Sequence, residues 1–434
     1  MFSRSPGRTL LPSKEDQRLC FFYQTIIENL VDSDHTRYLH SQLPALFSRS
    51  RSGSALQLAT KAISHAAWMK SLSRGYDEEM TAGTCKLAKT IQDPIEAKSD
   101  ETLYTVLLVS GYETITFNSE ALPAWGTHID GATALVKNRG SENFRTPLAC
   151  MMFLFIRRNA AQSHVQTCTP VDPIFETCSE LLAPYENIED RLLSNTMHIP
   201  NLQAWANGLL FKYSAKVEED EITELLQSAE DLDYELANWA LGVPSEWSYF
   251  TITRMETPKT SSIRTGLFIP DQLHRYPNLY VARTWNLYRV SRLIIQSIIS
   301  RVSALSSRAI NTSKVQIDAI SQSMVSQICA SIPFLLGYDC SELKYTSTSS
   351  SPTSLWPQCL PTKPRSSNNP GKFSLIWPLY VASSVESTPE AQRNWMRKQL
   401  DWIAGTGEAH AQVLRDCRSQ TLLGKPEAFR FDCV

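Results

Sequence analysis

The chain has 434 residues, a formal net charge of −2 and a pI near 6.5. Its hydrophobic fraction of 42% and charged fraction of 20% are ordinary for a globular protein with a sizeable core. The balanced charge excludes a global field that would draw the chain to nucleic acid. The longest apolar runs, such as residues 148–156, are too short to span a bilayer.

The N-terminal residues carry basic side chains but no apolar segment, so they do not form a secretory signal. Ten cysteines are scattered along the chain and include no Cys-x-x-Cys pair. This usage favours reduced thiols in an intracellular protein over a disulfide framework. We expect residues 1–12 to be disordered.

Helical periodicity dominates from residue 13 onward. Ser13 and Asp16 are spaced as a capping box before an apolar stripe that starts at Leu19. Residues 54–72 repeat apolar side chains at spacings of three and four, and Asp100 is expected to cap the next helix. These patterns predict amphipathic helices in the N-terminal third of the chain.

The stretch ALPAWGTHIDGATALVKNRG, residues 121–140, contains a Trp-x-x-His step. Its small residues Gly131, Ala132 and Ala134 are expected to admit a neighbouring helix, and Gly140 to end the helix that contains them. Packing is the favoured interpretation of this stretch, and ligand binding is the alternative.

Arg157 and Arg158 are interpreted as cations at the C-terminal end of an apolar helix, where they suit its dipole. Further on, residues 218–241 predict a helix with an acidic open face, and residues 279–305 predict a long helix. Pro333 and Gly337 mark a helix kink or end and its stop. Strand signals are poor, so the fold is predicted as all-α: a large multi-helix array with little or no β-sheet.

The predicted layout has four parts. After the N-terminus, a helical body spans residues 13–344, and a flexible segment rich in Ser, Thr and Pro spans 345–372. A C-terminal helical section, residues 373–434, is expected to pack back on the body.

No familiar constellation of catalytic, cofactor-binding or metal-binding residues is present in the sequence. It contains no Gly-x-Ser-x-Gly, phosphate-binding loop, dinucleotide fingerprint or His-Glu-x-x-His. His164 and Cys168 lie four apart, but nothing nearby supplies two further zinc ligands. We therefore predict no catalytic residue, no cofactor and no metal.

Several weak motifs follow one another in an order that is more informative than any one of them. The order is SDETLYTVLLVSGYE, AWGTHIDGATALVKNRGSENF, LANWALGVPSEWSYF, WNLYRVSRLIIQSII, ICASIPFLLG and IWPLYVASS. This succession resembles the C-terminal regulatory region of fungal transcription factors of the binuclear zinc cluster class, from about residue 21 to 414. The residues that carry the resemblance are Trp125, His128, Gly131, Ala132, Arg139, Gly140, Trp285, Asn286, Tyr288, Arg289, Arg292, Trp377, Pro378 and Leu379.

These motif residues are interpreted mainly as structural. In the helix that starts near residue 279, Trp285, Tyr288, Arg289 and Arg292 are offset by three and four, which places them on one face. A semi-buried ion-pair cluster between helices is favoured there over a pocket for an anionic effector.

The resemblance implies a fungal transcription regulator that acts in the nucleus. It also suggests a role in the control of a specialised-metabolite or other metabolic pathway. Family members usually carry an N-terminal six-cysteine zinc module that reads DNA, whereas Cys20 is the only cysteine before Cys85 here. We therefore expect no direct DNA binding from this chain alone. The expected partners are proteins, as a homodimer or in the transcription machinery, and a small-molecule effector, with no membrane.

Two other functions compete with this interpretation. The chain could be a helical enzyme or ligand-binding protein derived from the regulator fold, since a helical array with many aromatic residues can enclose a cavity. It could also be an adaptor or dominant-negative partner of full-length regulators. Turnover or binding of a pathway intermediate would favour an enzyme or ligand-binding protein. Co-purification with a full-length relative would favour an adaptor or dominant-negative partner.

Overall fold

The computed structural model describes residues 12–24, 34–72, 80–116, 125–177, 179–212, 219–253, 268, 270–306, 313–337 and 370–427. The chain divides into two compact units: unit 1 comprises residues 1–116 and 127–153, and unit 2 comprises residues 117–126 and 154–434. Within the described ranges the only strands are two short ones, so the all-α prediction is confirmed. The predicted four-part layout stays a prediction, and its residues 345–369 lie outside the described ranges.

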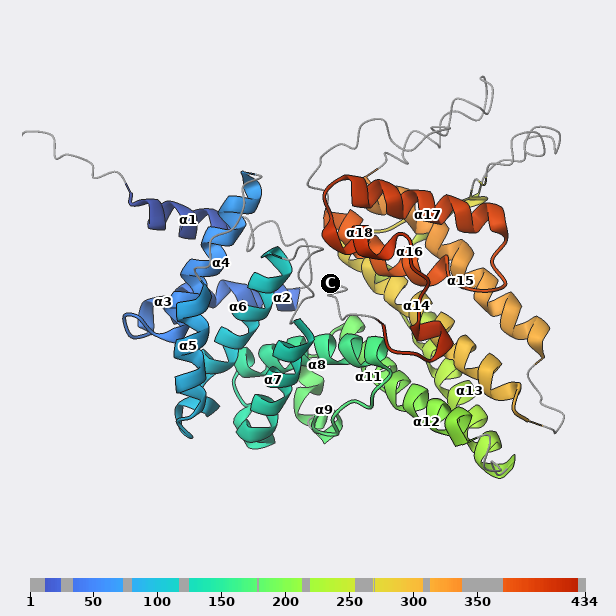
Figure 1. Ribbon diagram of the computed structural model, residues 1–434, viewed down its shortest axis with the longest axis horizontal. Coiled ribbons are helices and arrows are strands. Elements are labelled where there is room, and N and C mark those ends of the chain that lie inside the picture. The colour runs from blue at the N-terminus through green and yellow to red at the C-terminus, as the bar shows by residue number, and fades with distance from the viewer. Residues whose placement is uncertain are drawn as a thin grey trace, which may run out of the picture. The chain divides into compact units, whose positions relative to one another are not determined.

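Unit 1 is built around α4 (Ala55–Ser71), which contacts four other helices of the unit (Figure 1). The other α-helices of this unit are α1 (Lys14–Phe22), α2 (Asp34–Ser41), α3 (Leu43–Arg49), α5 (Met80–Ile91) and α6 (Asp100–Thr116), together with α7 (Trp125–Arg139) from Thr127 onward. α8 (Pro147–Thr167) begins in unit 1 and continues into unit 2.

The helix starts in unit 1 follow from short polar side chains. The capping box predicted for α1 is confirmed, because the Asp16 amide donates to Ser13 Oγ at 3.0 Å and the Ser13 amide to Asp16 Oδ2 at 3.2 Å. At α6 the prediction was wrong by one residue: Ser99 Oγ accepts the Thr102 amide at 3.1 Å, and Asp100 is the first helical residue. Satisfying these amides fixes where each helix begins.

Unit 2 contains the remaining elements. They are α9 (Ile174–Thr177), α10 (Ser179–Leu182), α11 (Ile188–Thr196), α12 (Ile199–Lys212), α13 (Glu219–Leu241), β1 (Phe250–Thr253), β2 (Gln272–Arg275), α14 (Leu279–Ser303), α15 (Lys314–Leu335), α16 (Ile376–Ala382), α17 (Glu390–Gly405) and α18 (Ala409–Leu414). Single 3₁₀ turns include η6 (Ser245–Trp247), η9 (Pro370–Leu375) and η10 (Thr421–Leu423).

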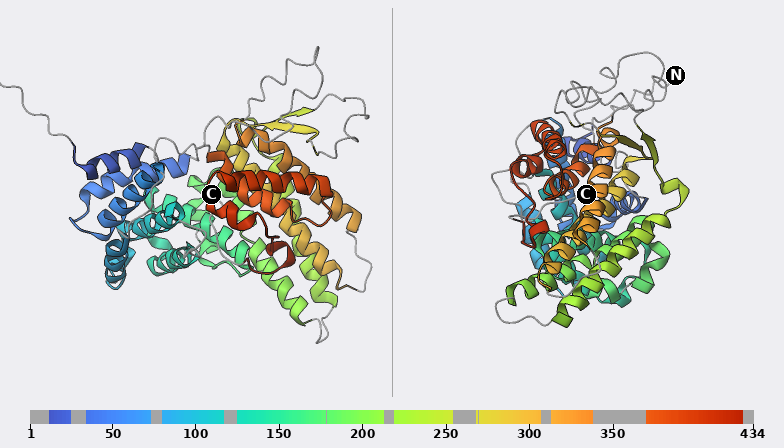
Figure 2. Two further views of the ribbon diagram at one scale, coloured as in Figure 1. Left: turned by 45° about the horizontal axis from the view of Figure 1, so that its top comes forward. Right: turned by 90° about the vertical axis from the view of Figure 1, so that its right-hand side faces the viewer.

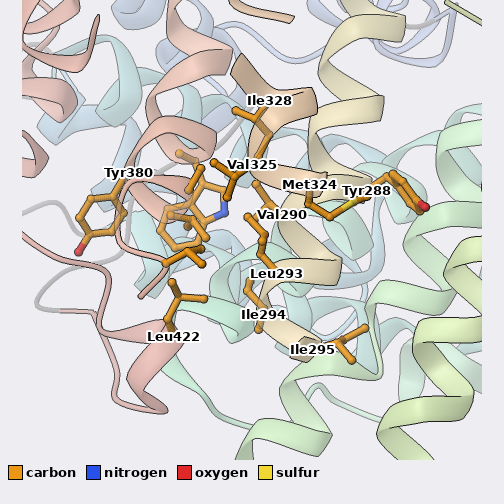
Figure 3. Packing of buried hydrophobic residues seen from close by; sticks show 14 of the residues in the cluster. Tyr288, Val290, Leu293, Ile294, Ile295, Met324, Val325, Ile328, Tyr380 and Leu422 are labelled. Carbon is orange, nitrogen blue, oxygen red and sulfur yellow. The ribbon is translucent and has the colours of Figure 1, made fainter. Parts of the chain in front are cut away.

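The core of unit 2 forms around α14, where 18 of 25 residues are buried. A helix buried on nearly all sides must be covered by other elements, and α14 contacts α12, α13, α15, α16 and η10. Figure 3 shows Val290, Leu293 and Ile294 of α14 facing side chains of α15 and α16. α14 is therefore the helix that positions most of the motif side chains.

A two-stranded antiparallel sheet lies against α15 at one edge of unit 2, drawn in yellow in Figure 2. The register pairs Phe250 with Arg275 and Thr251 with His274. The sequence offered no hairpin signal here, because nearly twenty residues separate the strands. β2 brings His274 and the following Tyr276 into the buried interior.

The last described residues fold back over the core. The Glu427 carboxylate accepts hydrogen bonds from Tyr380 Oη (2.8 Å), Ser419 Oγ (3.0 Å) and the Thr421 amide and hydroxyl (2.9 Å each). The Glu427 amide donates to Gln166 O of α8 at 2.8 Å. We call residues 415–427, which include η10, the closing segment, because they join α8 to α16.

Candidate functional site

The Trp-x-x-His stretch joins α7 to α6 within unit 1. His128 Nε2 lies 2.6 Å from Glu113 Oε1, and both side chains are one-quarter exposed. Arg139, at the last position of α7, pairs with Asp100 and lies over the Phe144 ring with its guanidinium carbon 5.0 Å from the centroid. The side chain of Trp125 lies outside the described part of the chain.

The small residues of α7 differ from their predicted role. Gly131 and Ala134 are exposed, and a Cβ built on Gly131 would meet open space. Only Ala132 is buried, so the expected close approach of a helix at all three positions was wrong. Gly140 follows the helix with φ at 79°, a conformation that glycine adopts without strain.

The α14 motif forms a polar and aromatic cluster in unit 2. The Trp285 and Tyr288 rings are 5.6 Å apart, and Trp239 of α13 packs on both. Arg292 donates to both carboxylate oxygens of Asp233 at 2.8 and 2.6 Å and to Tyr288 Oη at 3.0 Å. A bidentate pair of this kind fixes the angle of two side chains, so it joins α13 to α14.

Arg289 is fully buried and has no carboxylate partner among the described residues. Its guanidinium donates to Tyr276 Oη and Asn286 Oδ1 at 2.8 Å each, and to Gln327 Oε1 at 3.3 Å. The rings of Tyr249, Tyr276 and Trp285 surround its guanidinium carbon at 5.1, 5.8 and 5.8 Å. Neutral acceptors and ring faces therefore stabilise this charge.

His274 completes the Arg289 cluster, with its Nδ1 3.3 Å from Arg289 Nη2 and 3.0 Å from Tyr276 Oη. Burial, with a contribution from the Arg289 charge, lowers the pKa of His274 to about 2. The imidazole is therefore neutral at physiological pH and can accept a hydrogen bond from the guanidinium. Asn286 extends the network to α15 through Ser331 Oγ at 2.9 Å.

Trp377 and Pro378 belong to the buried first turn of α16. Proline at this position costs no intrahelical hydrogen bond, since the first amides of a helix have no partner within it. The Trp377 ring lies 5.7 Å from the ring of Tyr380 and packs in the same core as α14. The structure thus brings the α14 and α16 motif residues into one core, whereas those of α7 belong to unit 1.

A second buried charge cluster was missed by sequence reasoning. Arg157 and Arg158 do not end a helix, because α8 continues to Thr167 and buries both side chains. Glu189 of α11 accepts from Arg158, from Arg283 Nη2 at 3.1 Å and from Tyr280 Oη at 2.6 Å. Arg157 pairs with Glu186 at 2.7 Å. The cluster joins α8, α11 and α14.

The described residues contain no group of three or more His, Cys, Asp and Glu side chains placed to hold a metal ion. None of the helices in the described ranges has the length and apolar character needed to cross a membrane.

Comparison with known proteins identifies the family. The family model described as "Fungal specific transcription factor domain" matches residues 39–415, which is most of the chain. The chain belongs to this family. The fungal-specific transcription factor domain thus begins near the end of α2 in unit 1 and extends through α18 of unit 2.

A curated relative supports the same assignment. Transcription factor dbaG of Emericella nidulans is 24% identical over 338 residues, which cover 74% of this chain and 72% of that protein. No solved structure matches the chain. As a member of the fungal-specific transcription factor family, the chain is a fungal transcription regulator, and both buried arginine clusters are parts of its regulatory fold.

Proposed function

We propose that the chain regulates transcription in the nucleus through protein–protein contacts, in the control of a specialised-metabolite or other metabolic pathway. Membership of the fungal-specific transcription factor family supports this, as does the similarity to a curated transcription factor. A small-molecule effector is a further proposed partner. Direct DNA binding by this chain alone is not part of the proposal.

The observation that carries the protein-contact proposal is the outer face of α13. This helix contains eight Asp and Glu residues and no Lys or Arg. Tyr234 and Leu241 lie seven residues apart, two turns on one face, and are 68% and 85% exposed. Asp231 and Glu235 beside Tyr234 are exposed as well.

Two exposed apolar side chains within a field of carboxylates suit a partner with a basic surface and an apolar pocket. Two copies of the same acidic face would repel each other, so the proposal favours a different protein over self-association through α13. A homodimer that forms through this face would contradict it.

A reporter assay tests the proposal. We expect the chain, fused to an unrelated DNA-binding domain in a fungal reporter strain, to change reporter output. The double variant Y234S/L241S should lose that change, because the apolar contacts are removed while the charge of α13 is kept. V315S is the matched control, since Val315 is 79% exposed at the start of α15.

The reporter result must be read at equal protein levels. An unchanged output from Y234S/L241S would overturn the role of α13. A fluorescent fusion excluded from the nucleus would overturn the proposed location. A gel shift of promoter DNA by the chain alone at physiological salt would contradict the expectation that it needs a partner to reach DNA.

The adaptor alternative has a separate test. Co-purification of the chain with a full-length regulator from the same fungus, lost in Y234S/L241S, would assign the α13 partner as that regulator.

A further inference from the structure

Arg301, in the last turn of α14, carries a guanidinium that has no counter-ion among the residues that the structure describes. Its Nη1 donates to Asn207 Oδ1 at 3.2 Å. Its Nε and Nη2 are buried and have no acceptor among the described residues. Burial lowers the pKa of Arg301, and no carboxylate in the described ranges offsets this. An arginine nevertheless stays protonated at neutral pH, so the positive charge remains.

The two nitrogens without acceptors lie on the same edge of the guanidinium. Nη1 is on the side of Cδ, whereas Nε–H and one Nη2–H point in parallel from the opposite edge. Through this edge an arginine can donate two parallel hydrogen bonds to the two oxygens of a carboxylate. A single planar oxyanion would satisfy both donors and neutralise the charge.

The side chain that accepts a hydrogen bond from Arg301, that of Asn207, is polar and uncharged. Asn207 and Gln203 lie one turn apart on α12, and the fully buried Gln203 has an Oε1 without a partner among the described residues. Gln203 Nε2 donates to Cys168 Sγ at 3.5 Å. Burial raises the pKa of the Cys168 thiol to about 11, despite the opposing charge of Arg301. The thiol therefore does not supply the missing negative charge at neutral pH.

The closing segment covers the guanidinium on the Nη1 side. Gly424 adopts φ of +73°, and a Cβ there would lie 2.0 Å from Arg301 Nη1 and 2.5 Å from Asn207 Oδ1. Only glycine allows the backbone to pass so close. The guanidinium is therefore held in place from one side, and its free edge is directed away from Asn207.

The other arginines of α14 show how unusual this arrangement is. Arg283 and Arg292 pair with carboxylates, and every nitrogen of Arg289 has a neutral acceptor. We propose that the Nε–Nη2 edge of Arg301 is a binding site for the carboxylate of a small organic acid. This site does not depend on the proposed role in transcription.

Acetate is the probe for the first experiment, and unfolding of the full chain is the readout. Sodium acetate replaces sodium chloride at fixed pH and ionic strength, and acetamide serves as the uncharged analogue. Acetate should stabilise the wild type in a saturable way. When the acetate concentration is ten times its dissociation constant, the equilibrium constant for folding should be about 11-fold larger than without acetate. Acetamide and chloride should not reproduce this.

Variants assign the effect to Arg301. R301M should lose the acetate response, yet unfold in chloride at the same denaturant concentration as wild type or a higher one, because a buried uncompensated charge is gone. R301K keeps the charge but lacks the two-donor edge, so acetate and chloride should act alike on it. R415M removes an exposed arginine, and should respond like wild type.

Three results would overturn the proposal. The first is an equal acetate response in R301M and wild type. The second is an acetamide effect as large as that of acetate, which would mean that the edge does not select a negative charge. The third is an equal effect of chloride and acetate on wild type, which would mean a site without preference for carboxylates.

Discussion

Replacing Glu189 by glutamine tests whether the buried charge cluster of α8, α11 and α14 holds unit 2 together. Glu189 is 2% exposed and is the carboxylate shared by Arg158 and Arg283. E189Q keeps the size and one acceptor oxygen but removes the negative charge. The guanidiniums of Arg158 and Arg283, residues that are 3% and 8% exposed, then remain buried without the negative charge of Glu189.

The expected cost follows from breaking a buried ion pair on one side only. Such a change destabilises by about 3–5 kcal/mol, because the remaining charge stays desolvated. Domains are usually stable by about 5–15 kcal/mol, so E189Q should remove a large share. With a slope of about 3 kcal/mol/M, the urea midpoint should fall by roughly 1–2 M.

Tryptophan fluorescence during urea unfolding is a suitable assay. Seven of the ten tryptophans belong to unit 2 and have side chains that the structure describes: residues 205, 239, 247, 285, 377, 395 and 402. E235Q on the exposed face of α13 is the matched control and should shift stability by no more than about 0.5 kcal/mol. A loss below about 1 kcal/mol in E189Q would refute the reasoning that its charge is needed in the core.

The other predictions concern the Arg289 cluster, the closing segment and α13. The pKa of His274 falls from 6.5 in the unfolded chain to about 2 in the folded one. The contribution of His274 to the free energy of unfolding is therefore fully present above pH 6.5 and is lost progressively as the pH falls below that value. Between pH 8 and pH 5 the protonation of His274 should lower the free energy of unfolding by about 2 kcal/mol. In urea titrations at several pH values, H274Q should lack this part of the pH dependence. G424A should destabilise by at least about 1–2 kcal/mol from its left-handed backbone alone, and a loss below about 0.5 kcal/mol would contradict the contact with Arg301. D233N should destabilise by about 3 kcal/mol or more, since it leaves Arg292 without its carboxylate; thermal unfolding close to that of wild type would show that the pair contributes little.

Local signals made the helices predictable from the sequence. Ser13 and Asp16 specify a helix start whatever surrounds them, and the structure has the predicted capping box. Pro333 does lie in the last turn of α15, and Gly337 follows it with φ of 78°. The spacing of Trp285, Tyr288 and Arg292 was enough to place them on one face, because helix geometry alone decides it.

Long-range partners were not predictable in this way. Glu189 lies 31 residues from Arg158 and 94 from Arg283, and nothing in the local pattern joins them. The arginine pair in α8 looked like a helix end because charges usually lie at the surface, yet the apolar pattern resumes at Ala160 and Ala161. That continuation was the available signal for a buried pair.

The Arg289 cluster was half predicted. An ion pair between helices is present, but it belongs to Arg292, whereas Arg289 is stabilised by neutral acceptors and rings. Two of those groups, His274 and Tyr276, come from β2 and the residue after it, and no local sequence pattern indicated that they lie beside α14. Two strands that pair across a long connection, as β1 and β2 do, have no short turn motif between them that would reveal the pairing in the sequence.

The closing segment has a consequence for the order in which the protein matures. Glu427 bonds to α8 and α16 through residues that are synthesised up to 261 positions earlier, as at Gln166. During synthesis at about 5–20 residues per second, α8 therefore waits on the order of ten seconds or more for this partner, and α16 waits a few seconds. A chain that stops short of Glu427 lacks the carboxylate that holds Tyr380 and Thr421, so η10, which contacts α14, loses that anchor.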